Sequence, residues 1–258
     1  MALRSPILVG YYTMVRKDVV RMLRIWGQTL LPPAVTMALY FAIFGTFIGS
    51  QVAAIDGYPY IQFIVPGLVM MAVITNSYMN TVFSFYFAKW QKTFHEILVS
   101  PMPSWAVVAG YVSGGVVRGF LTAIVVIAVS LFFTKLTVFS FAIIFGAAFL
   151  TSFLFSLLGL INAMYAKSFD AINIVPTFVL TPLTYLGGIF YSIDQLPEFF
   201  RIISLFNPIL YMVNAFRYGF LGVSDVPLSL AFGVMGVMTV VAFGTVLYFF
   251  SKGSGMKQ

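Results

Sequence analysis

Long apolar runs separated by short polar breaks organise most of this chain. Runs that could cross a bilayer extend over about residues 30–50, 60–88, 104–133, 138–165, 171–191 and 227–250. A membrane-spanning helix needs about 20 mostly apolar residues, and these runs have that length. Pro176 and Pro182 are expected to bend the fifth run. The pattern predicts an all-α polytopic membrane protein with six transmembrane helices.

The stretch before the last run, residues 192–222, is too apolar for an ordinary solvated loop. A polar turn, SIDQLPE, leads into FFRIISLF and then, after Asn207 and Pro208, into ILYMVNAFRYGFLG. Neither apolar piece is long enough to cross, and the proline separates them. We therefore expect a re-entrant helical hairpin at the external face. Irregular backbone at membrane depth must be surrounded by protein or by a water-filled cavity.

Residues 5–26 predict a basic amphipathic helix ahead of the first span. At about 100° per residue, one face carries Val15, Val19, Met22, Leu23 and Trp26, and the other carries Arg16, Lys17, Arg21 and Arg24. Such a helix suits the membrane surface, with its cations toward anionic lipid headgroups. Asp18, near the apolar edge, can pair with Arg21 three residues later. A mitochondrial-type targeting peptide is the alternative, but the first span follows at once without a cleavage context.

Composition agrees with a membrane protein. Hydrophobic residues make up 61% of the chain and charged residues 8%, with a mean hydropathy of +1.01, whereas soluble domains carry about 25% charged residues. The chain has no cysteine, which excludes a disulfide framework and thiolate metal ligands. Its net charge of +7 comes from basic residues beside the spans, so we attribute it to cytoplasmic loops and expect no nucleic-acid partner.

The distribution of Lys and Arg predicts the orientation. Six spans place both termini on one side, and that side then holds ten basic residues: Arg4, Arg16, Lys17, Arg21, Arg24, Lys89, Lys92, Lys167, Lys252 and Lys257. The other side holds three: Lys135, Arg201 and Arg217. Because cytoplasmic loops are enriched in Lys and Arg, we expect both termini in the cytoplasm. Counting the hairpin as a seventh crossing would place Lys252 and Lys257 outside, against this rule.

Residues suited to catalysis or metal binding are scarce. His95 is the only histidine, and the sequence HEILV lacks the second histidine of a metalloprotease helix. The phosphate-binding pattern GxxxxGK[ST] is absent. The seven acids all fall at span ends or in connections, whereas proton relays usually place a carboxylate inside the bundle. We expect no catalytic residue and no metal, and a proton-driven carrier is disfavoured.

A few polar residues inside the apolar runs are candidates for a transport path. Arg118 is the only charge within an apolar run; it either extends to the inner surface or pairs with a carbonyl, or it attracts an anionic substrate. The other candidates are Asn76 and Asn80 on one face of the second span, and Thr177, Thr181 and Tyr185 on one face of the fifth. These residues either form hydrogen bonds between helices or line a polar route.

Glycines in the third run are spaced for close helix contact. Gly110, Gly114, Gly115 and Gly119 form two overlapping GxxxG spacings, and small residues at this spacing let backbones approach closely. Packing within the chain and dimerisation both explain the pattern.

Residues 89–105, KWQKTFHEILVSPMPSW, form the most polar stretch between the two ends of the chain. A short helical pattern precedes Pro101 and Pro103, and Ser104 can cap the next span. EILVSPMPSW (96–105), together with LTPLTYLGGIFYSIDQLP (180–197) and FNPILYMVNAFRYGFLG (206–222), resembles the ABC-2-type transporter permease family. The order of predicted elements agrees with that family over nearly the whole chain.

The resemblance implies a permease subunit of an ATP-binding-cassette exporter in a bacterial inner membrane. A second copy of the permease would complete a homodimer among membrane lipids, and a separate ATPase subunit would bind ATP and Mg²⁺, so no cofactor is expected in this chain. The N-terminal helix would also contact the ATPase, the second and fifth spans would line the path at the dimer interface, and the hairpin would form an outer gate.

The resemblance also assigns residues. Those expected to couple to the ATPase are Lys92, Phe94, His95, Glu96, Ile97 and Leu98, and those expected to hold the hairpin's shape are Asn207, Pro208 and Arg217. A lipidic or drug-like substrate is expected, with polysaccharide or glycolipid export as the alternative. Two other classes of protein stay open as alternatives: a self-sufficient secondary transporter or channel, and a membrane scaffold.

Overall fold

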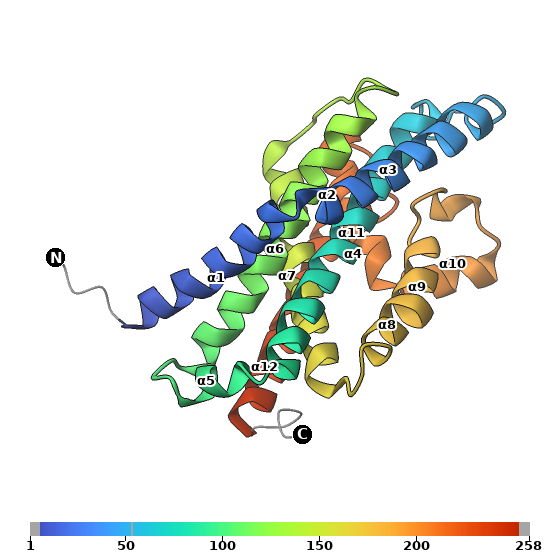
Figure 1. Cartoon of the computed structure of the whole chain (residues 1–258). Helices are drawn as coiled ribbons and strands as arrows, with labels where there is room; N and C mark the ends of the chain where they lie inside the picture. The colour runs from blue at the N-terminus through green and yellow to red at the C-terminus, as the bar shows by residue number, and fades with distance from the viewer. Residues whose placement is uncertain (1–5, 53, 253–258) are drawn as a thin grey trace.

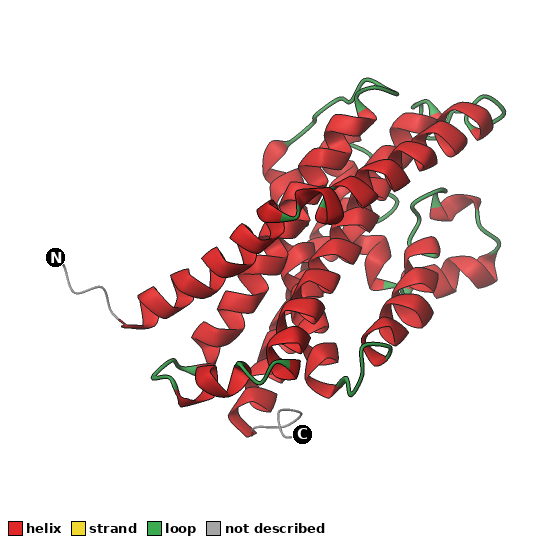
Figure 2. Cartoon of the chain, in the orientation of Figure 1, coloured by secondary structure: helices red, strands yellow, loops and turns green. Residues whose placement is uncertain are grey.

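The computed structural model describes residues 6–52 and 54–252, which are helical throughout apart from short connections and contain no strand (Figures 1 and 2). The helices are α1 (Pro6–Arg24), α2 (Trp26–Thr29), α3 (Leu31–Tyr40), the π-helix η1 (Phe41–Ile48), α4 (Tyr60–Trp90), α5 (Phe94–Val99), α6 (Ser104–Ser130), α7 (Phe141–Tyr165), α8 (Ala171–Val175), the π-helix η2 (Pro176–Leu180), α9 (Thr181–Tyr185), the 3₁₀ helix η3 (Ile193–Gln195), α10 (Glu198–Leu205), α11 (Pro208–Leu221) and α12 (Leu228–Lys252).

Five helical stretches in the described part are long and apolar enough to cross a membrane. They are Trp26–Ile48, α4, α6, α7 and α12. The fifth crossing expected from the sequence corresponds to α8, η2 and α9, a shorter apolar helix over Ala171–Tyr185. We expected this helix to reach Tyr191, and that boundary was wrong. The helix ends early because glycines follow it, and Gly188 turns the chain with a φ of +69°.

The bundle is built around α4, which Figure 1 shows passing through its middle. Side chains of α4 such as Phe63, Leu68 and Tyr78 are completely buried among α6, α7 and α11. Figure 1 also shows α8, α9 and α10 standing to one side of these central helices. The described part of the protein therefore has a dense core in which α4 is surrounded by α6, α7 and α11, and a more exposed segment that follows α7.

Small residues bring α4, α6 and α7 close together. A Cβ atom at Gly115 of α6 would overlap with Thr81 Oγ1 of α4 and with Ser156 Oγ of α7. At Gly119, one turn later, it would overlap with Ser77 and Ser152 in the same way. These two glycines thus serve packing within the chain, which was one of the two explanations for their spacing.

The helix α1 runs beside the first half of α6 and in the same direction. Along this contact Met14 lies against Gly110 and Asp18 lies against Gly114. Asp18 and Arg21 form the expected ion pair, with Arg21 Nη2 lying 3.3 Å from Asp18 Oδ1. The orientation of α1 relative to a membrane surface stays a prediction.

Contacts between connections define two ends of the bundle. At one end, the ring of Phe94 in α5 lies 6.2 Å from the ring of Phe250 in α12. At the other end, the hydroxyl of Tyr58, just before α4, donates to the carbonyl of Leu221 at 2.7 Å. The start of α1 lies near Met102, beside α5. Both ends of the described chain are therefore on the α5 side, as an even number of crossings requires.

The stretch between Ser192 and Asp225 leaves and returns at the same end of the bundle. Its two helices, α10 and α11, are bent by 86° at the break around Asn207. The Ser192 hydroxyl donates to the Asp225 carboxylate at 2.6 Å, so the beginning and the end of the stretch touch. A segment whose two ends meet in this way does not cross, and it has the form of a re-entrant hairpin.

Candidate functional site

The structure brings three of the predicted path residues together where α1, α4 and α6 meet. Arg118 Nη2 of α6 donates to Asn76 Oδ1 of α4 at 3.2 Å. Asn80, one turn further along α4, lines a cavity of about 300 Å³ together with Arg118. The full lining is Arg21, Met22, Ile25, Thr29, Asn80, Phe83, Phe87 and Arg118. We call this space the arginine cavity.

Polar groups in the arginine cavity lack partners. Asn80 is 3% exposed, and its side-chain nitrogen has no hydrogen-bond partner among the described residues. The same holds for the buried Nε of Arg118. Unpaired buried donors are costly, so a cavity lined by them is suited to a ligand that accepts hydrogen bonds.

The other predicted path residues lie elsewhere. Thr177, Thr181 and Tyr185 are exposed on the η2–α9 segment, and no residue of that segment lines the arginine cavity. The hydroxyl of Tyr185 lies 3.1 Å from that of Tyr40 in α3. That hydrogen bond connects the first span to the fifth.

The predicted coupling segment contains a short helix, α5, anchored by one aromatic side chain. Phe94 is buried, and its ring lies 4.9 Å from that of Phe85 in α4. It therefore faces the bundle, whereas Glu96 is exposed and Val99 is 86% exposed. Lys92, which precedes α5, is exposed and has a φ of +60°, so the chain turns sharply between α4 and α5. The side chains of His95, Ile97 and Leu98 lie outside the described part of the structure.

The hairpin residues singled out from the sequence occupy specific positions. Asn207 caps α11, since its Oδ1 accepts from the backbone nitrogen of Ile209 at 3.0 Å, and its Nδ2 donates to the carbonyl of Leu183 at 2.6 Å. Pro208 follows as the first residue of α11, where a proline is well tolerated. The cap thus joins the tip of the hairpin to the end of the fifth span.

Arg217 lies fully inside the protein behind the hairpin. Its guanidinium donates to the carbonyl of Gly188, lies 3.6 Å from the Asp225 carboxylate, and stacks 3.7 Å from the centre of the Phe63 ring. The Ser192 hydroxyl bonds to the same carboxylate. Arg217 therefore joins both ends of the hairpin to α4.

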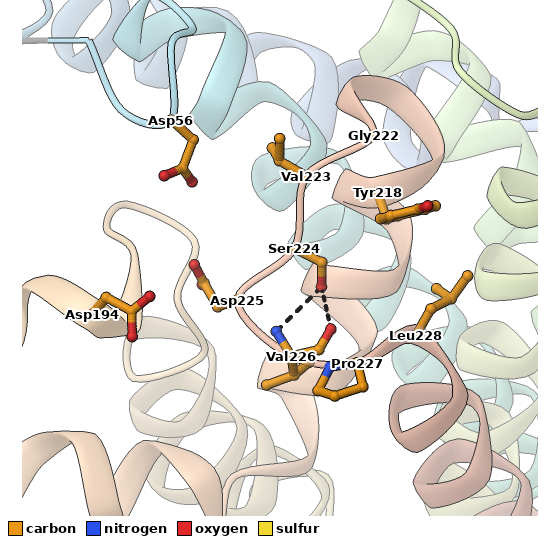
Figure 3. A pocket seen from close by; sticks show the side chains of 10 residues that line it. All are labelled: Asp56, Asp194, Tyr218, Gly222, Val223, Ser224, Asp225, Val226, Pro227 and Leu228. Atoms are coloured by element: carbon orange, nitrogen blue, oxygen red, sulfur yellow. Dashed lines mark hydrogen bonds between the residues drawn. The ribbon is translucent and has the colours of Figure 1, made fainter.

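A wide polar pocket of about 710 Å³ opens at the hairpin end of the bundle. Figure 3 shows Asp56, Asp194 and Asp225 facing this space from three separate segments. Asp225 is engaged by Arg217, and Asp194 lies 3.6 Å from Arg201. Among the described residues no group of three or more His, Cys, Asp or Glu is placed to hold a metal ion.

Sequence reasoning missed two polar members of the arginine cavity. Arg21 was assigned to the face of the N-terminal helix that points toward lipid headgroups, and Thr29 was assigned no role. Their positions depend on how α1 packs against α6, and the signal for that packing was the pair Gly110 and Gly114, which receive Met14 and Asp18.

An all-helical bundle with several crossings, a re-entrant segment and a helix-lined cavity that contains buried polar groups has the construction of a membrane transport permease. Comparison with known proteins agrees: residues 10–221 match the family model described as ABC-2 type transporter. The chain belongs to this family, and it is a multi-pass transport permease of the inner membrane.

Two kinds of curated relative illustrate the range of similarity. The chain is 52% identical over 243 residues, 94% of each protein, to the inner membrane transport permease YadH of Escherichia coli (strain K12). It is 26% identical over 208 residues, 80% of each protein, to nodulation protein J of Rhizobium leguminosarum bv. viciae.

Proposed function

We propose that this chain is the membrane-spanning subunit of an ATP-driven exporter, which moves a lipidic or drug-like substrate by alternating access. In this proposal a second copy completes the path, and a separate ATPase subunit binds ATP and Mg²⁺. Membership in the ABC-2 type transporter family supports an ATPase partner. The termini and α5 face the cytoplasm, in agreement with the positive-inside rule.

The observation that carries the proposal is the construction of α5. A helix of six residues projects at the end of the bundle where the described chain begins and ends, with Glu96 and Val99 exposed. It is fixed to the bundle through the rings of Phe94 and Phe85, and Phe85 in turn contacts Tyr111 of α6 and Phe250 of α12. A partner that pushes on α5 would therefore move three long helices together.

That linkage supports a mechanism. Closure of the ATPase dimer displaces α5, and the aromatic contacts transmit the displacement to α4 as a rigid body. Asn80 of α4 lies five residues from Phe85, so movement of α4 changes the arginine cavity. ATP hydrolysis at the partner and access to the cavity are coupled in this way.

A charge reversal at the exposed face of α5 tests the coupling. In liposomes containing permease and ATPase, we expect Glu96→Lys to lower substrate-stimulated ATP hydrolysis at least about fivefold. That factor corresponds to the lower end of typical coupling free energies between two sites, about 1 kcal/mol. Asp170→Lys is the control, since Asp170 is an exposed acid in the turn between α7 and α8, outside α5. Full stimulation in the Glu96 variant, or transport by the purified permease without an ATPase, would contradict the proposal.

A further inference from the structure

The arginine cavity has the charge of an anion site. Two guanidinium groups, those of Arg21 and Arg118, line it, and no acid does so among the described residues. Both cations face the same cavity, and like charges in so confined a space repel one another. Asp18 offsets part of the Arg21 charge, but its carboxylate oxygens are already occupied by Arg21 and by the Ser84 hydroxyl at 2.8 Å. An anion between the two arginines would relieve the repulsion.

Hydrogen-bond donors in the cavity are unused. The Nδ2 of Asn80, on a side chain that is 3% exposed, and the buried Nε of Arg118 have no partner among the described residues. A phosphate oxygen accepts hydrogen bonds from planar guanidinium groups in paired geometry. A second, independent feature therefore indicates the same ligand chemistry as the charge.

The rim of the cavity is apolar and open. Phe83 and Phe87 are 40% and 41% exposed, and Ile25 is 40% exposed. Phe87 is three residues from the end of α4 and Asn80 is ten, which at 1.5 Å per residue places the cavity roughly 5–15 Å inside that end. In a bilayer this depth corresponds to the boundary between headgroups and acyl chains of one leaflet. A free ion has no apolar part to match such a rim, whereas an amphiphile has.

We propose that the arginine cavity binds the phosphate headgroup of an anionic amphiphile, which enters sideways from the cytoplasmic leaflet and lays its apolar chain along Phe83 and Phe87. The volume of about 300 Å³ lies at the lower end of the range for small-molecule sites, roughly 300–1,000 Å³, and suits a headgroup whose chain remains outside. This inference rests on the proposed function in treating the bound amphiphile as cargo and in placing the α5 end of the bundle at the cytoplasmic leaflet.

Binding to the purified permease, without any ATPase, tests the site. The probe is a pyrene-tailed phosphatidate added to the protein in detergent micelles, with three competitors: dioleoyl phosphatidate, dioleoylglycerol and sodium phosphate. We expect displacement by dioleoyl phosphatidate, none by dioleoylglycerol, and displacement by sodium phosphate only at far higher concentration. Equal displacement by dioleoylglycerol would contradict recognition of the phosphate headgroup. Equal displacement by sodium phosphate would contradict a contribution of the apolar tail to binding.

Substitutions locate the binding. Arg118→Gln should weaken phosphatidate binding about tenfold or more, since hydrogen bonds to charged groups are worth at least that factor. Asn80→Leu removes a buried donor that has no partner, so it should fold at least as well as the unsubstituted protein and still bind the probe more weakly. Arg16→Gln is the matched control, because it removes one positive charge from an exposed position of α1 outside the cavity lining.

The outcomes separate the two proposals. Unchanged affinity in both Arg118→Gln and Asn80→Leu, or an equal loss in Arg16→Gln, would overturn the headgroup site whatever the ATPase does. Phosphatidate that binds as expected but does not stimulate ATP hydrolysis in the complex would leave the site standing and would remove phosphatidate as cargo.

Discussion

At the scale of single residues, contact among the central helices depends on small and hydroxylated side chains. Ser77, Thr81, Ser152 and Ser156 are all buried where α4, α6 and α7 meet. Lipid chains are as apolar as leucine, so burying apolar surface gives little drive for helices to associate in a membrane, and close packing has to supply it. The glycines of α6 make that close packing possible.

Gly115→Ala should therefore destabilise the bundle. The added methyl group would overlap with oxygen atoms of Thr81 and Ser156, and with the carbonyl of Ser77 at 2.9 Å; overpacking of this kind costs about 1–3 kcal/mol. Thermal unfolding in detergent measures the effect. Gly233→Ala in α12 is the control, because a Cβ there meets nothing within 4 Å and alanine favours a helix. An unchanged midpoint for Gly115→Ala would show that the three helices are less tightly packed.

The contribution of Asp18 to the stability of the packing between α1 and α6 depends on pH. Burial raises the pKa of this carboxyl above its ordinary value, and this effect outweighs the opposing influence of Arg21, Ser84 and Lys17. The folded protein therefore holds a proton that the unfolded chain has lost between about pH 3.9 and the raised pKa. It follows that the contribution of Asp18 to stability is greatest at low pH and decreases as the pH rises through the raised pKa.

Asp18→Asn carries a neutral group at every pH and can still accept from Ser84. We expect this variant to be at least as stable as the unsubstituted protein at pH 7 and to lose the part of the pH dependence that lies between the ordinary and the raised pKa of Asp18, about 1.4 kcal/mol for each unit of pKa shift removed. Unfolding midpoints at several pH values measure both effects. Asp170→Asn, which changes an exposed acid, should leave the profile unaltered. A stability that depends more steeply on pH in Asp18→Asn than in the unsubstituted protein would contradict this prediction.

At the scale of elements, the features that could be predicted from the sequence are those set by the local pattern of apolar and polar residues. The apolar runs located α4, α6, α7 and α12 within a few residues, and the Asn207–Pro208 break located the bend of the hairpin. The end of α9 was missed because the chain turns at Gly188, whose carbonyl receives Arg217 from a distant helix. The arginine cavity was missed as a unit because Arg21 reaches it only through the packing of α1 on α6.

The hairpin offers an element-scale prediction about its buried ion pair. Arg217→Met leaves the buried carboxylate of Asp225 without its cation, which should cost about 3–5 kcal/mol. The double variant with Asp225→Asn removes both charges, so it should lose less than the sum of the single variants. Arg201→Met breaks the exposed pair with Asp194 and should cost about 0–1 kcal/mol. Additive losses in the double variant would mean that Arg217 and Asp225 do not interact.

At the scale of the whole molecule, the two ends of the bundle differ in construction. One end carries α5 and the aromatic contacts from Phe85 and Phe94 to Phe250. The other carries the hairpin and the wide pocket of Figure 3. Between them lie the long helices and the shorter α8–α9 segment. The hairpin helix α11 packs on α4, α7 and α12, so a signal applied at α5 can reach the hairpin through these helices.

The absence of native cysteine makes the orientation of these two ends directly measurable. Glu96→Cys in α5 and Glu198→Cys in α10 place single thiols at exposed positions on the two sides. The cells used have an intact inner membrane and a permeabilised outer membrane. In them, a membrane-impermeant maleimide should label Glu198→Cys at once and Glu96→Cys only after the inner membrane is opened. The expectation follows because the α5 side carries most of the basic residues, and these stay in the cytoplasm. Labelling of Glu96→Cys in intact cells would place α5 where no ATPase can reach it, and labelling of both variants would also mean that an even number of crossings separates them, so that the short α8–α9 segment does not cross.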